Sequence, residues 1–536
     1  MPYDVAVLGA GFAGSLLARL LALRGRSVLL VERGRHPRFS LGESSTPLAA
    51  LALERLSARY EQPDLRSLAA HGRWRRDLAG LGCGLKRGFT FYRHHPGEPI
   101  RNGHTNQARL LVSASPDADS ADCQWLRADV DLHMVERARA AGVDYRDQFE
   151  VLSAEDTGDG MRLRGRGLRG AVDLDAGFVV DASGAGEVLA HALGIEPASH
   201  EIRFSSRLLF GHFAGVVPFA DAAARHGAGF PAGPYPDDWA AVHHLLDEGW
   251  MYALRFDDGL VSAGLLLDDA TTPTGADAGD GDPAARWQAV LSRYPTLALA
   301  FAGAQPRPPG IRATGRLQRR RHGAVGDRWA MLPQTFAFFD PLFSTGIAWS
   351  LLGVERLVGI LETGNPSSDS LRRYESLLRA EADQQQALLA AAYAARLDFR
   401  VFRDVSFLYF ACVSFEEIRQ RLLDDEPDHA SGADNADQRD SAAWRGFLGA
   451  GDEQWTALFG QAEARARAAV IGDDGAQRRF SAWVASGIET RNLVGLGESP
   501  THLYGVDMDR LVGASRLLGL SRAEMRARLP RLRGGL

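Results

Sequence analysis

Residues 1–32 place a glycine-rich turn between two apolar strands, and no other feature constrains the fold so strongly. An apolar run over residues 5–8 enters Gly9-Ala10-Gly11-Phe12-Ala13-Gly14, which opens an apolar helix, and a second strand over 27–31 ends in Glu32. The first glycine allows a tight turn, the second lets backbone approach a pyrophosphate, and the third lets the helix lie close to the strand. The pattern predicts a dinucleotide-binding βαβ unit. The simpler alternative is a turn that only joins a strand to a helix.

Each part of this unit has an expected contact with the nucleotide. The helix N-terminus offers unpaired N–H groups and a positive dipole end to phosphates. Glu32 follows the second strand, where an acid can accept hydrogen bonds from a ribose diol. The residues of this unit expected to bind the cofactor are Gly9, Gly11, Phe12, Ala13, Gly14, Glu32 and Arg33.

Composition limits the other classes of function. A chain of 536 residues suggests two or more lobes, and its 45% hydrophobic and 24% charged content is ordinary for a globular protein. A formal charge of −6 gives no indication of nucleic-acid binding. The three cysteines are not spaced as the ligands of a metal site are, so we expect free thiols and no metal site. Because no apolar run reaches about 18 residues, we expect a cytoplasmic protein without stable membrane insertion.

Hydrophobic patterning divides the chain into four parts. Residues 1–200 hold the first part of the nucleotide-binding lobe, including a buried strand that runs into Asp181-Ala182-Ser183-Gly184. Strand-like alternation over 201–310 predicts an antiparallel sheet forming a substrate lobe. Residues 311–365 return to the nucleotide-binding lobe, and 366–536 are expected to be helical. Two polar stretches, 268–283 and 424–440, are expected to be loops.

A second set of motifs completes the predicted nucleotide site. Gly326-Asp327 precedes Asp340-Pro341-Leu342-Phe343-Ser344-Thr345-Gly346, which opens a helix. A helix starting after Pro341 would point backbone N–H groups at an anion or at the edge of a flavin ring. Asp327 could hydrogen-bond a ribityl chain. These are the parts needed to hold FAD in an extended form.

With these motifs the chain resembles the flavin-dependent monooxygenase superfamily, the p-hydroxybenzoate hydroxylase-like enzymes, and within it the flavin-dependent halogenases. The matching segments are GESSTP from Gly42, LKRGFTF from Leu85, LRADVD from Leu126, the DASG and DPLFSTG motifs, and the glycine turn. The resemblance implies an α/β fold with a Rossmann-like FAD lobe of the GR2 type, an inserted antiparallel sheet and a helical C-terminal region. It adds these cofactor-binding residues: Ser44, Arg127, Asp327, Pro341, Gly346 and Ile347.

The resemblance also implies a reaction and its partners. A separate NAD(P)H-flavin reductase would supply reduced FAD, and with O2 and a halide bound near Thr345 and Gly346 the enzyme would form hypohalous acid. Lys86 occupies the family's lysine position and would orient that acid, or carry the halogen as a haloamine, toward an aromatic ring. The alternative for Lys86 is a surface lysine at the start of a strand. The protein would be a monomer or a homodimer.

Two departures from the family pattern bear on the substrate. The signature Trp-x-Trp-x-Ile-Pro becomes Trp250-Met251-Tyr252-Ala253-Leu254-Arg255, which weakens the discrimination against ordinary monooxygenation. Phe343 stands where tryptophan halogenases carry a glutamate, so a phenol- or pyrrole-type ring, free or bound to a carrier protein, is expected instead. The predicted substrate pocket contains Trp250, Tyr252 and Phe343.

Two other classes of function remain open. The same fold could serve a flavin hydroxylase or an FAD-dependent reductase or dehydrogenase of polyene or isoprenoid substrates, and the altered tryptophan motif favours these. A flavin-binding protein without catalysis is a third possibility. The adjacent pairs His94-His95 and His243-His244 are not expected to bind metal, because neighbouring residues on a strand face opposite ways.

Overall fold

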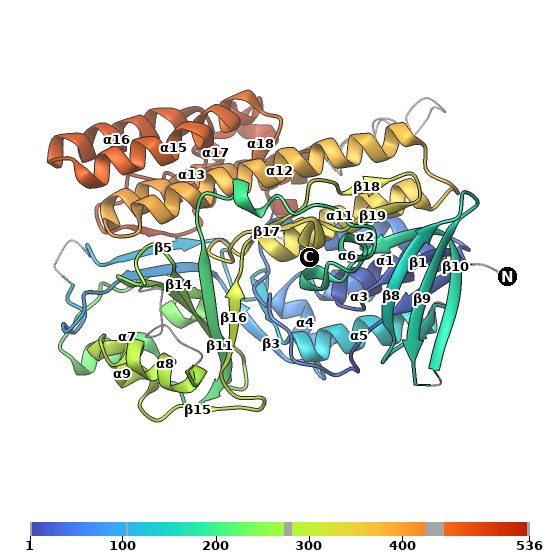
Figure 1. Cartoon of the computed structure of the whole chain (residues 1–536). Coiled ribbons are helices and arrows are strands. Elements are labelled where there is room, and N and C mark those ends of the chain that lie inside the picture. The colour runs from blue at the N-terminus through green and yellow to red at the C-terminus, as the bar shows by residue number, and fades with distance from the viewer. Residues whose placement is uncertain (1–2, 103–105, 169, 273–280, 424–443, 533–536) are drawn as a thin grey trace.

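Two large β-sheets lie side by side beneath a layer of long helices (Figure 1). The computed structural model describes residues 3–102, 106–168, 170–272, 281–423 and 444–532. The polar stretch expected at 424–440 and part of the one at 268–283 lie outside these ranges.

The first sheet is the predicted Rossmann-like unit. Five of its strands run parallel: β19, β10, β1, β2 and β7. Most of these neighbouring strands come from distant parts of the sequence. In spatial order the path is β18 (Val325–Gly326), β19 (Trp329–Met331), β10 (Gly170–Asp181), β1 (Tyr3–Leu8), β2 (Val28–Val31) and β7 (Asp144–Arg146), and β10 also pairs with the hairpin of β8 (Glu150–Asp156) and β9 (Met161–Gly167). The near-continuous apolar runs of β1 and β2 are typical of parallel strands covered on both faces. The α/β fold class is confirmed.

Helices bring the cofactor motifs to one edge of this sheet. Helix α1 (Phe12–Leu23) packs against α5 (Arg127–Ala140) and α11 (Thr345–Leu361), and α2 (Pro47–Tyr60) packs on α11. The shorter helices of this lobe are α3 (Pro63–Ser67), α4 (His71–Asp77), α6 (Val188–Ala192) and α10 (Pro333–Phe336). Three helices that begin at sequence motifs therefore converge, although α5 and α11 lie far apart in the sequence.

The second sheet is mainly antiparallel, as expected of the substrate lobe. Its order is β15 (Gln305–Pro306), β11 (Ser206–Ala214), β14 (Val261–Asp268), β13 (Gly249–Arg255), β12 (Ala241–Leu245), β4 (Gly88–Arg93), β5 (Arg109–Ser113) and β21 (Leu503–Tyr504), with β16 (Arg312–Arg316) also on β11. Strand β4 runs parallel to β12, and β21 runs parallel to β5. Because β4 and β5 belong to this sheet, the boundary expected at residue 200 does not separate the two sheets.

The far face of the second sheet is covered by α7 (Phe219–Arg225), α8 (Pro283–Leu291) and α9 (Pro295–Phe301), which share a core with Phe213 and Trp287. Two small sheets lie between the large ones. They are β3 (Cys83–Lys86) paired with β6 (Asp122–Trp125), and β17 (Arg319–Arg320) paired with β20 (Ala337–Phe338). The first of these two carries Lys86.

The C-terminal region is helical, as expected. Figure 1 shows α12 and α13 spanning the top of both lobes, with α15 and α16 stacked on them. The helices are α12 (Ser368–Ala395), α13 (Phe399–Leu423), α15 (Glu453–Ile471), α16 (Asp474–Ile488), α17 (Met508–Gly513) and α18 (Arg522–Leu532). None of the helices in the described ranges has the length and apolar character required to span a bilayer.

A buried carboxylate joins this helical layer to the FAD lobe. Glu381 of α12 is fully buried and accepts hydrogen bonds from both terminal nitrogens of Arg356 (2.9 and 2.6 Å) and from the Trp349 indole (2.8 Å), both on α11. Its Oε1 also accepts from the backbone N–H of Phe447 at 2.8 Å. Four donors meet one carboxylate where two long helices cross.

Removing this carboxylate should destabilise the protein strongly. In Glu381→Ala the buried Arg356 guanidinium loses both of its hydrogen bonds to Glu381, and breaking a buried pair in this way costs about 3–5 kcal/mol. Urea unfolding followed by circular dichroism measures the effect. The exposed Arg372–Asp369 pair near the start of the same helix supplies the control, because Asp369→Ala should cost less than about 1 kcal/mol. Equal losses in the two variants would contradict this account.

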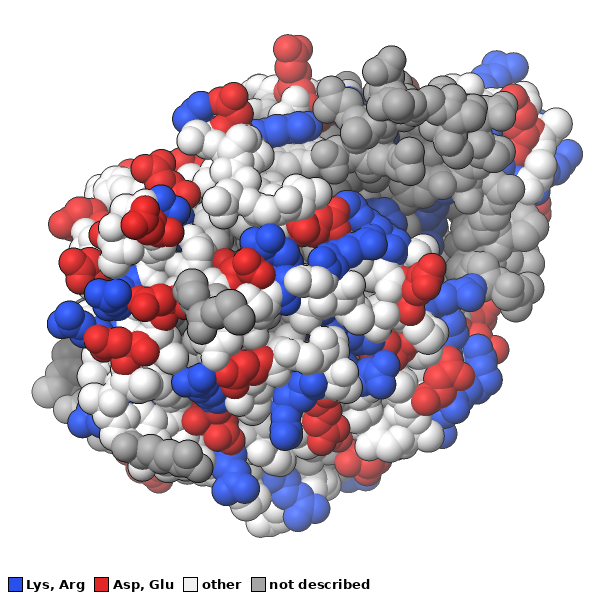
Figure 2. All heavy atoms as spheres, turned by 90° about the vertical axis from the view of Figure 1, so that its right-hand side faces the viewer, with Lys and Arg blue, Asp and Glu red and all other residues white. Residues whose placement is uncertain are grey.

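Acidic and basic side chains are mixed on the face that carries the β8–β10 hairpin. Figure 2 shows Lys and Arg side chains among Asp and Glu side chains over this face. Several pair across neighbouring strands, for example Arg162 with Asp175 at 2.9 Å. Such a surface has charges of both signs close together.

Candidate active site

A cavity of about 910 Å³ runs from the glycine turn to the N-terminus of α11. A volume of this size is at the upper end of the range for cofactor pockets. The predicted cofactor, halide and substrate residues that line it are Gly9, Gly11, Phe12, Ala13, Gly14, Glu32, Arg33, Ser44, Arg127, Tyr252, Pro341, Thr345, Gly346 and Ile347.

The three glycines of the turn do different work. Gly9 has a φ of +104°, and a Cβ there would lie 2.7 Å from the Ala182 carbonyl oxygen. A Cβ on Gly14 would lie 2.1 Å from the Gly9 carbonyl oxygen, so both positions require glycine for folding. A Cβ on Gly11 would meet nothing closer than 3.5 Å, the Arg127 Nη2 atom. Gly11 therefore leaves space in the cavity rather than in the packed protein, which is what close approach of a pyrophosphate requires.

Glu32 is held with its carboxylate at the nucleotide end of the cavity. It accepts from the backbone N–H groups of Ala10 (3.1 Å) and Gly34 (2.8 Å) and from Arg38 Nη2 (3.2 Å). Burial opposes ionisation, but Arg38 and the two amides outweigh it and hold the pKa of Glu32 below its usual value. A charged, fixed carboxylate at the end of β2 is suited to a ribose diol.

Arg127 is held by Asp131, a residue that sequence reasoning did not place in the site. Asp131 is fully buried, pairs with Arg127 Nε at 2.8 Å, and accepts from the backbone N–H of Phe12 at 3.1 Å. Arg127 also donates to the Leu41 carbonyl oxygen at 2.6 Å. This network joins the loop before α2 to the start of α1. The spacing of Arg127 and Asp131, four residues apart on a helix within LRADVD, could have predicted their pairing from the sequence.

At the other end of the cavity the DPLFSTG loop delivers the first amides of α11. Ser344 adopts a left-handed conformation (φ 52°) immediately before the helix, and its hydroxyl contacts that of Ser44 at 3.1 Å. Asp340 is buried and braces the loop by accepting from the Leu342 N–H (2.9 Å) and the Tyr393 hydroxyl (2.6 Å). Burial raises the pKa of Asp340 to about 7. The unpaired amides at the start of α11 face the cavity, where an anion or a flavin edge would be stabilised.

The expectation for Asp327 requires a correction. Asp327 precedes β19, whereas the cavity lies at the opposite end of that strand, beyond Met331. Its side chain is therefore not among the lining groups. Gln334, three residues after Met331, lines the cavity instead, and its side chain lies 3.7 Å from a Cβ built on Gly346. The rule that ligands bind beyond the carboxyl ends of parallel strands could have selected it.

A second cavity, of about 100 Å³, lies below α13 and is lined mainly by aliphatic side chains, with a few aromatic and polar ones. Among them are Phe89 of β4 and Tyr409 and Phe410 of α13. Thr46 belongs to its wall, whereas Ser44, two residues earlier, belongs to the wall of the larger cavity. The loop 44–46 thus separates the two cavities.

Lys86 lies in the partition between these cavities in the sense that it contacts the loop 44–46, and it is not itself among the residues that line either cavity. It is fully buried, its ammonium donates to the Ser45 carbonyl oxygen, and Nζ lies 4.2 Å from the ring centre of Phe89. Burial lowers the pKa of His243, which lines the larger cavity, and the positive charge of Lys86 lowers it further. The alternative of a surface lysine is therefore wrong. The composition also sets this residue apart, because Lys86 is the only lysine among the 61 Lys and Arg residues of the chain.

Asp122 is the acidic neighbour of Lys86. The two residues are directly opposite in the β3–β6 pair, and both are buried. Burial lowers the pKa of Lys86, and the charge of Asp122 opposes that effect. Burial likewise raises the pKa of Asp122, while Lys86 lowers it. The amine is thus less basic than an ordinary lysine, which favours the neutral, nucleophilic form.

Trp250 and Phe343 were expected to line the substrate pocket, and the structure places neither in the lining of the two cavities. Both are buried, because Trp250 packs on His243 with ring centres 5.3 Å apart, and Phe343 stacks on Tyr409 at 4.5 Å. Phe343 thus lies behind Tyr409, and it is Tyr409 that lines the second cavity. Tyr252 lines the larger cavity and not the second one, so its expected place in the substrate pocket stays a prediction.

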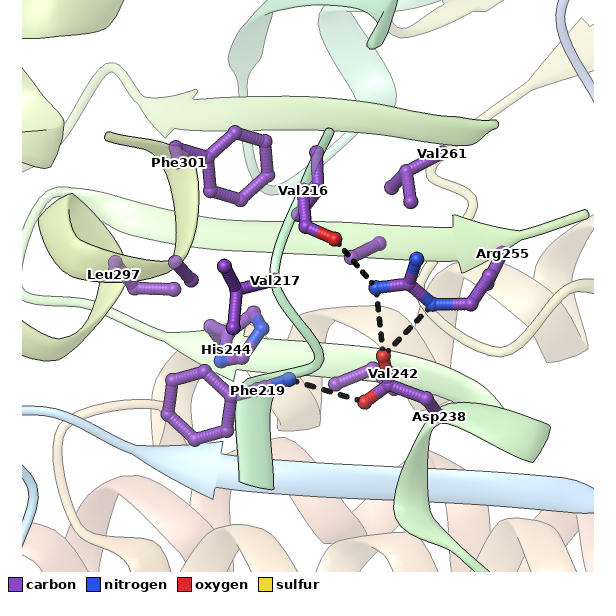
Figure 3. A pocket seen from close by; sticks show the side chains of 12 residues that line it. Val216, Val217, Phe219, Asp238, Val242, His244, Arg255, Val261, Leu297 and Phe301 are labelled. Atoms are coloured by element: carbon purple, nitrogen blue, oxygen red, sulfur yellow. Dashed lines mark hydrogen bonds and ion pairs between the residues drawn. The ribbon is translucent and has the colours of Figure 1, made fainter. Parts of the chain in front are cut away.

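The altered tryptophan motif affects the two faces of β13 differently. Tyr252 and Leu254 face the larger cavity, whereas Arg255 faces a small cavity of about 20 Å³ on the other side of the sheet. Figure 3 shows Arg255 reaching Asp238 and the Val216 carbonyl oxygen there, at 3.0 and 3.1 Å. This space holds about one water molecule, so Arg255 belongs to sheet packing rather than to the active site.

The histidines lie as neighbours across strands rather than along them. His94 Nε2 lies 3.0 Å from His244 Nδ1, and burial lowers the pKa of His94 to about 3, so the pair is neutral. Elsewhere, ligand atoms of His71, Cys83 and Asp257 lie within 4.8 Å of one another. Asp257 is already paired with Arg75 at 2.7 Å, and burial raises the pKa of the Cys83 thiol to about 12. A protonated thiol and an occupied carboxylate are poor metal ligands.

Comparison with known families identifies the cofactor. The sequence model described as "FAD dependent oxidoreductase" matches residues 4–325, which is more than half of the chain. The chain belongs to the FAD-dependent oxidoreductase family. It is therefore an enzyme, and its cofactor is FAD. The fixed Glu32, the space at Gly11 and the amides at the start of α11 fit the ribose, the pyrophosphate and the ring of FAD respectively.

The relatives of this FAD-dependent oxidoreductase include halogenases. The tetracycline 7-halogenase of Kitasatospora aureofaciens is 29% identical over 355 residues, which cover 65% of this chain and 61% of that relative. The monodechloroaminopyrrolnitrin halogenase PrnC of Pseudomonas fluorescens is 26% identical over 491 residues, covering 88% of this chain and 82% of that relative. The halogenase PltM, solved with phloroglucinol and FAD, has a similar fold, with a TM-score of 0.79 at 23% identity over 93% of this chain and 98% of that one.

Proposed function

We propose that this enzyme is an FAD-dependent halogenase that acts on an electron-rich aromatic substrate. The observation that carries the proposal is that the only lysine of the chain is buried in the partition between the cofactor cavity and a second cavity that has an aromatic wall. The printed functions of the relatives, which include a tetracycline 7-halogenase and a pyrrole-carrier protein chlorinase, support the same class of reaction.

In this proposal the oxidant forms in the larger cavity and the substrate is halogenated in the second one. When bound and reduced, FAD supplies with O2 the oxidising power that turns halide into hypohalous acid. Amides at Thr345 and Gly346 bind the halide, because the N-terminus of a helix stabilises an anion. The Lys86 amine meets hypohalous acid in the partition and either hydrogen-bonds it or takes the halogen as a haloamine, releasing water. The substrate ring waits in the second cavity, where it can receive the halogen.

The proposal extends to the partners and setting of the enzyme. Reduced FAD comes from a separate NAD(P)H-flavin reductase. The substrate is a phenol- or pyrrole-type ring, free or bound to a carrier protein. The enzyme works in the cytoplasm as a monomer or a homodimer.

An assay with reduced FAD, O2, chloride or bromide, and a panel of phenols, pyrroles and indoles tests the proposal. Mass spectrometry distinguishes a halogenated product from one with an added oxygen. A hydroxylated product, insensitive to halide, would support the hydroxylase alternative that the altered tryptophan motif favours.

The pH dependence tests the role of Asp122. Its negative charge raises the pKa of Lys86, so Asp122→Asn should lower that pKa and shift the corresponding limb of the pH–rate profile to lower pH. If a neutral amine carries the halogen, the rising limb moves; if the ammonium hydrogen-bonds hypohalous acid, the falling limb moves. The exposed Asp119→Asn change serves as the control and should leave the profile in place. A profile that Asp122→Asn does not move would rule out this coupling.

A further inference from the structure

The second cavity has walls suited to one aromatic ring. Its volume of about 100 Å³ is below the roughly 150 Å³ of an apolar cavity that binds benzene, so a bound ring would be in close contact with these walls. Phe89, Tyr409 and Phe410 form one aromatic wall, with ring centres of Phe89 and Phe410 5.4 Å apart. Lys86 Nζ lies over the Phe89 ring, so a substrate ring against this wall is close to the amine.

Most polar groups in the wall of this cavity are already engaged. The Tyr409 hydroxyl donates to the Phe343 carbonyl oxygen at 2.8 Å, and the Ser414 hydroxyl donates to the Phe410 carbonyl oxygen at 2.6 Å. Arg421 donates to Glu54 through Nη1 and to Glu417 through Nε, both at 2.9 Å. These groups have partners within the protein and need none from a ligand.

Two groups in the wall keep hydrogen-bonding capacity among the described residues: the Ser113 hydroxyl, which has no partner there, and Glu417, of whose carboxylate only half is engaged. Oε1 accepts from Arg421, whereas Oε2 has no donor among the residues that the structure describes. The side chain is 18% exposed and lines the cavity. A carboxylate oxygen that faces a largely apolar cavity can accept a hydrogen bond from a donor placed there.

We propose that Glu417 binds a hydroxyl or ring N–H group of the aromatic substrate and thereby orients the ring toward Lys86. This inference rests on the proposed function for the identity of the cavity. A hydrogen bond from a phenol or pyrrole donor to a carboxylate is stronger than one between neutral groups. It also pushes electron density into the ring, which makes the ring more reactive toward an electrophilic halogen. Rings without such a donor would leave Oε2 unpaired and bind weakly.

Equilibrium binding of phenol and toluene tests this inference. The two probes have nearly the same size, and only phenol has a donor. Calorimetric titration of the FAD-loaded protein, with no halide or reductant, should give wild-type affinity at least ~10-fold higher for phenol. In Glu417→Leu this preference should fall below ~3-fold, and Glu417→Gln, which can still accept a neutral hydrogen bond, should lie between.

Glu416→Gln is the matched control. Glu416 is the preceding residue of α13, pairs with Arg419 at 2.8 Å and does not line the cavity, so its variant should keep the wild-type preference. In Glu417→Gln the Arg421 guanidinium still has Glu54, which preserves the fold. Urea unfolding of each variant verifies this.

Two results would overturn the inference: wild-type protein that shows no preference for phenol, including protein that binds neither probe, or a Glu417→Leu variant that keeps the preference. Because these measurements involve no turnover, they are independent of the chemistry. A protein that prefers phenol through Glu417 but yields no halogenated product in the full assay would refute the proposed reaction and leave the binding role of Glu417 intact.

Discussion

Lys86→Ala is expected to abolish halogen transfer while FAD binding and O2 consumption continue. The amine is the only lysine of the chain and contacts the loop between the two cavities, so no other lysine can replace it. Loss of a nucleophilic or acid–base group of this kind lowers rates by roughly 10²–10⁴-fold. Product formation by mass spectrometry, set against O2 uptake, measures the separation of the two processes.

Two further variants identify what the amine contributes. Lys86→Met keeps the volume and should be as inactive as Lys86→Ala, which separates chemistry from packing. Lys86→Arg should also fail, because a guanidinium stays protonated and is a poor nucleophile. Full product formation by Lys86→Ala would show that the lysine is a structural residue and that another group handles the oxidant.

Gly11→Val is expected to eliminate FAD binding from an otherwise folded protein. Gly11 has a φ of −70° and a ψ of 175°, which valine adopts readily, and a Cβ there meets no atom closer than 3.5 Å. The added methyl groups would instead fill the space that the pyrophosphate needs. We expect at least a ~100-fold loss of affinity, about 3 kcal/mol, measured by titration of the protein against flavin fluorescence.

Gly14→Ala supplies the contrasting case. Its Cβ would collide with the Gly9 carbonyl oxygen, so this smaller change should destabilise the lobe itself and lower the urea midpoint. Gly11→Val should leave that midpoint close to the wild-type value. A Gly11→Val protein that still binds FAD tightly would contradict the placement of the pyrophosphate at this turn.

Local patterns selected residues of the expected nucleotide site that the structure brings together around one cavity. The glycine turn, Glu32 and the start of α11 are each recognised from a few consecutive residues, because each motif has a fixed backbone geometry that creates its own contacts. Asp327 failed for the opposite reason. Whether an acid beside a short strand reaches the cofactor depends on which end of the strand it occupies, and that is set by the pairing of β19 with β10, a strand from a much earlier part of the chain.

The substrate half of the site depends on distant parts of the chain. Tyr409, Phe410 and Glu417 lie on α13, far from Lys86 in the sequence, and only tertiary packing brings them together. Trp250 and Phe343 were assigned to the pocket from motifs, but each is covered by another aromatic residue that takes its place at the wall. The sequence distinguishes Lys86 by the absence of any other lysine in the chain rather than by a local motif.

The order in which strands enter the second sheet has a consequence for synthesis. β4 and β5 leave the ribosome first, β12 to β14 follow only after a long intervening segment, and β21 arrives with Leu503 and Tyr504. Such non-local pairings close slowly, and until they close the early hairpin presents open edges that invite aggregation. The growing chain must therefore keep β4 and β5 in a productive state until β21 has been made, so a strand from the C-terminal helical region completes a sheet begun near the start.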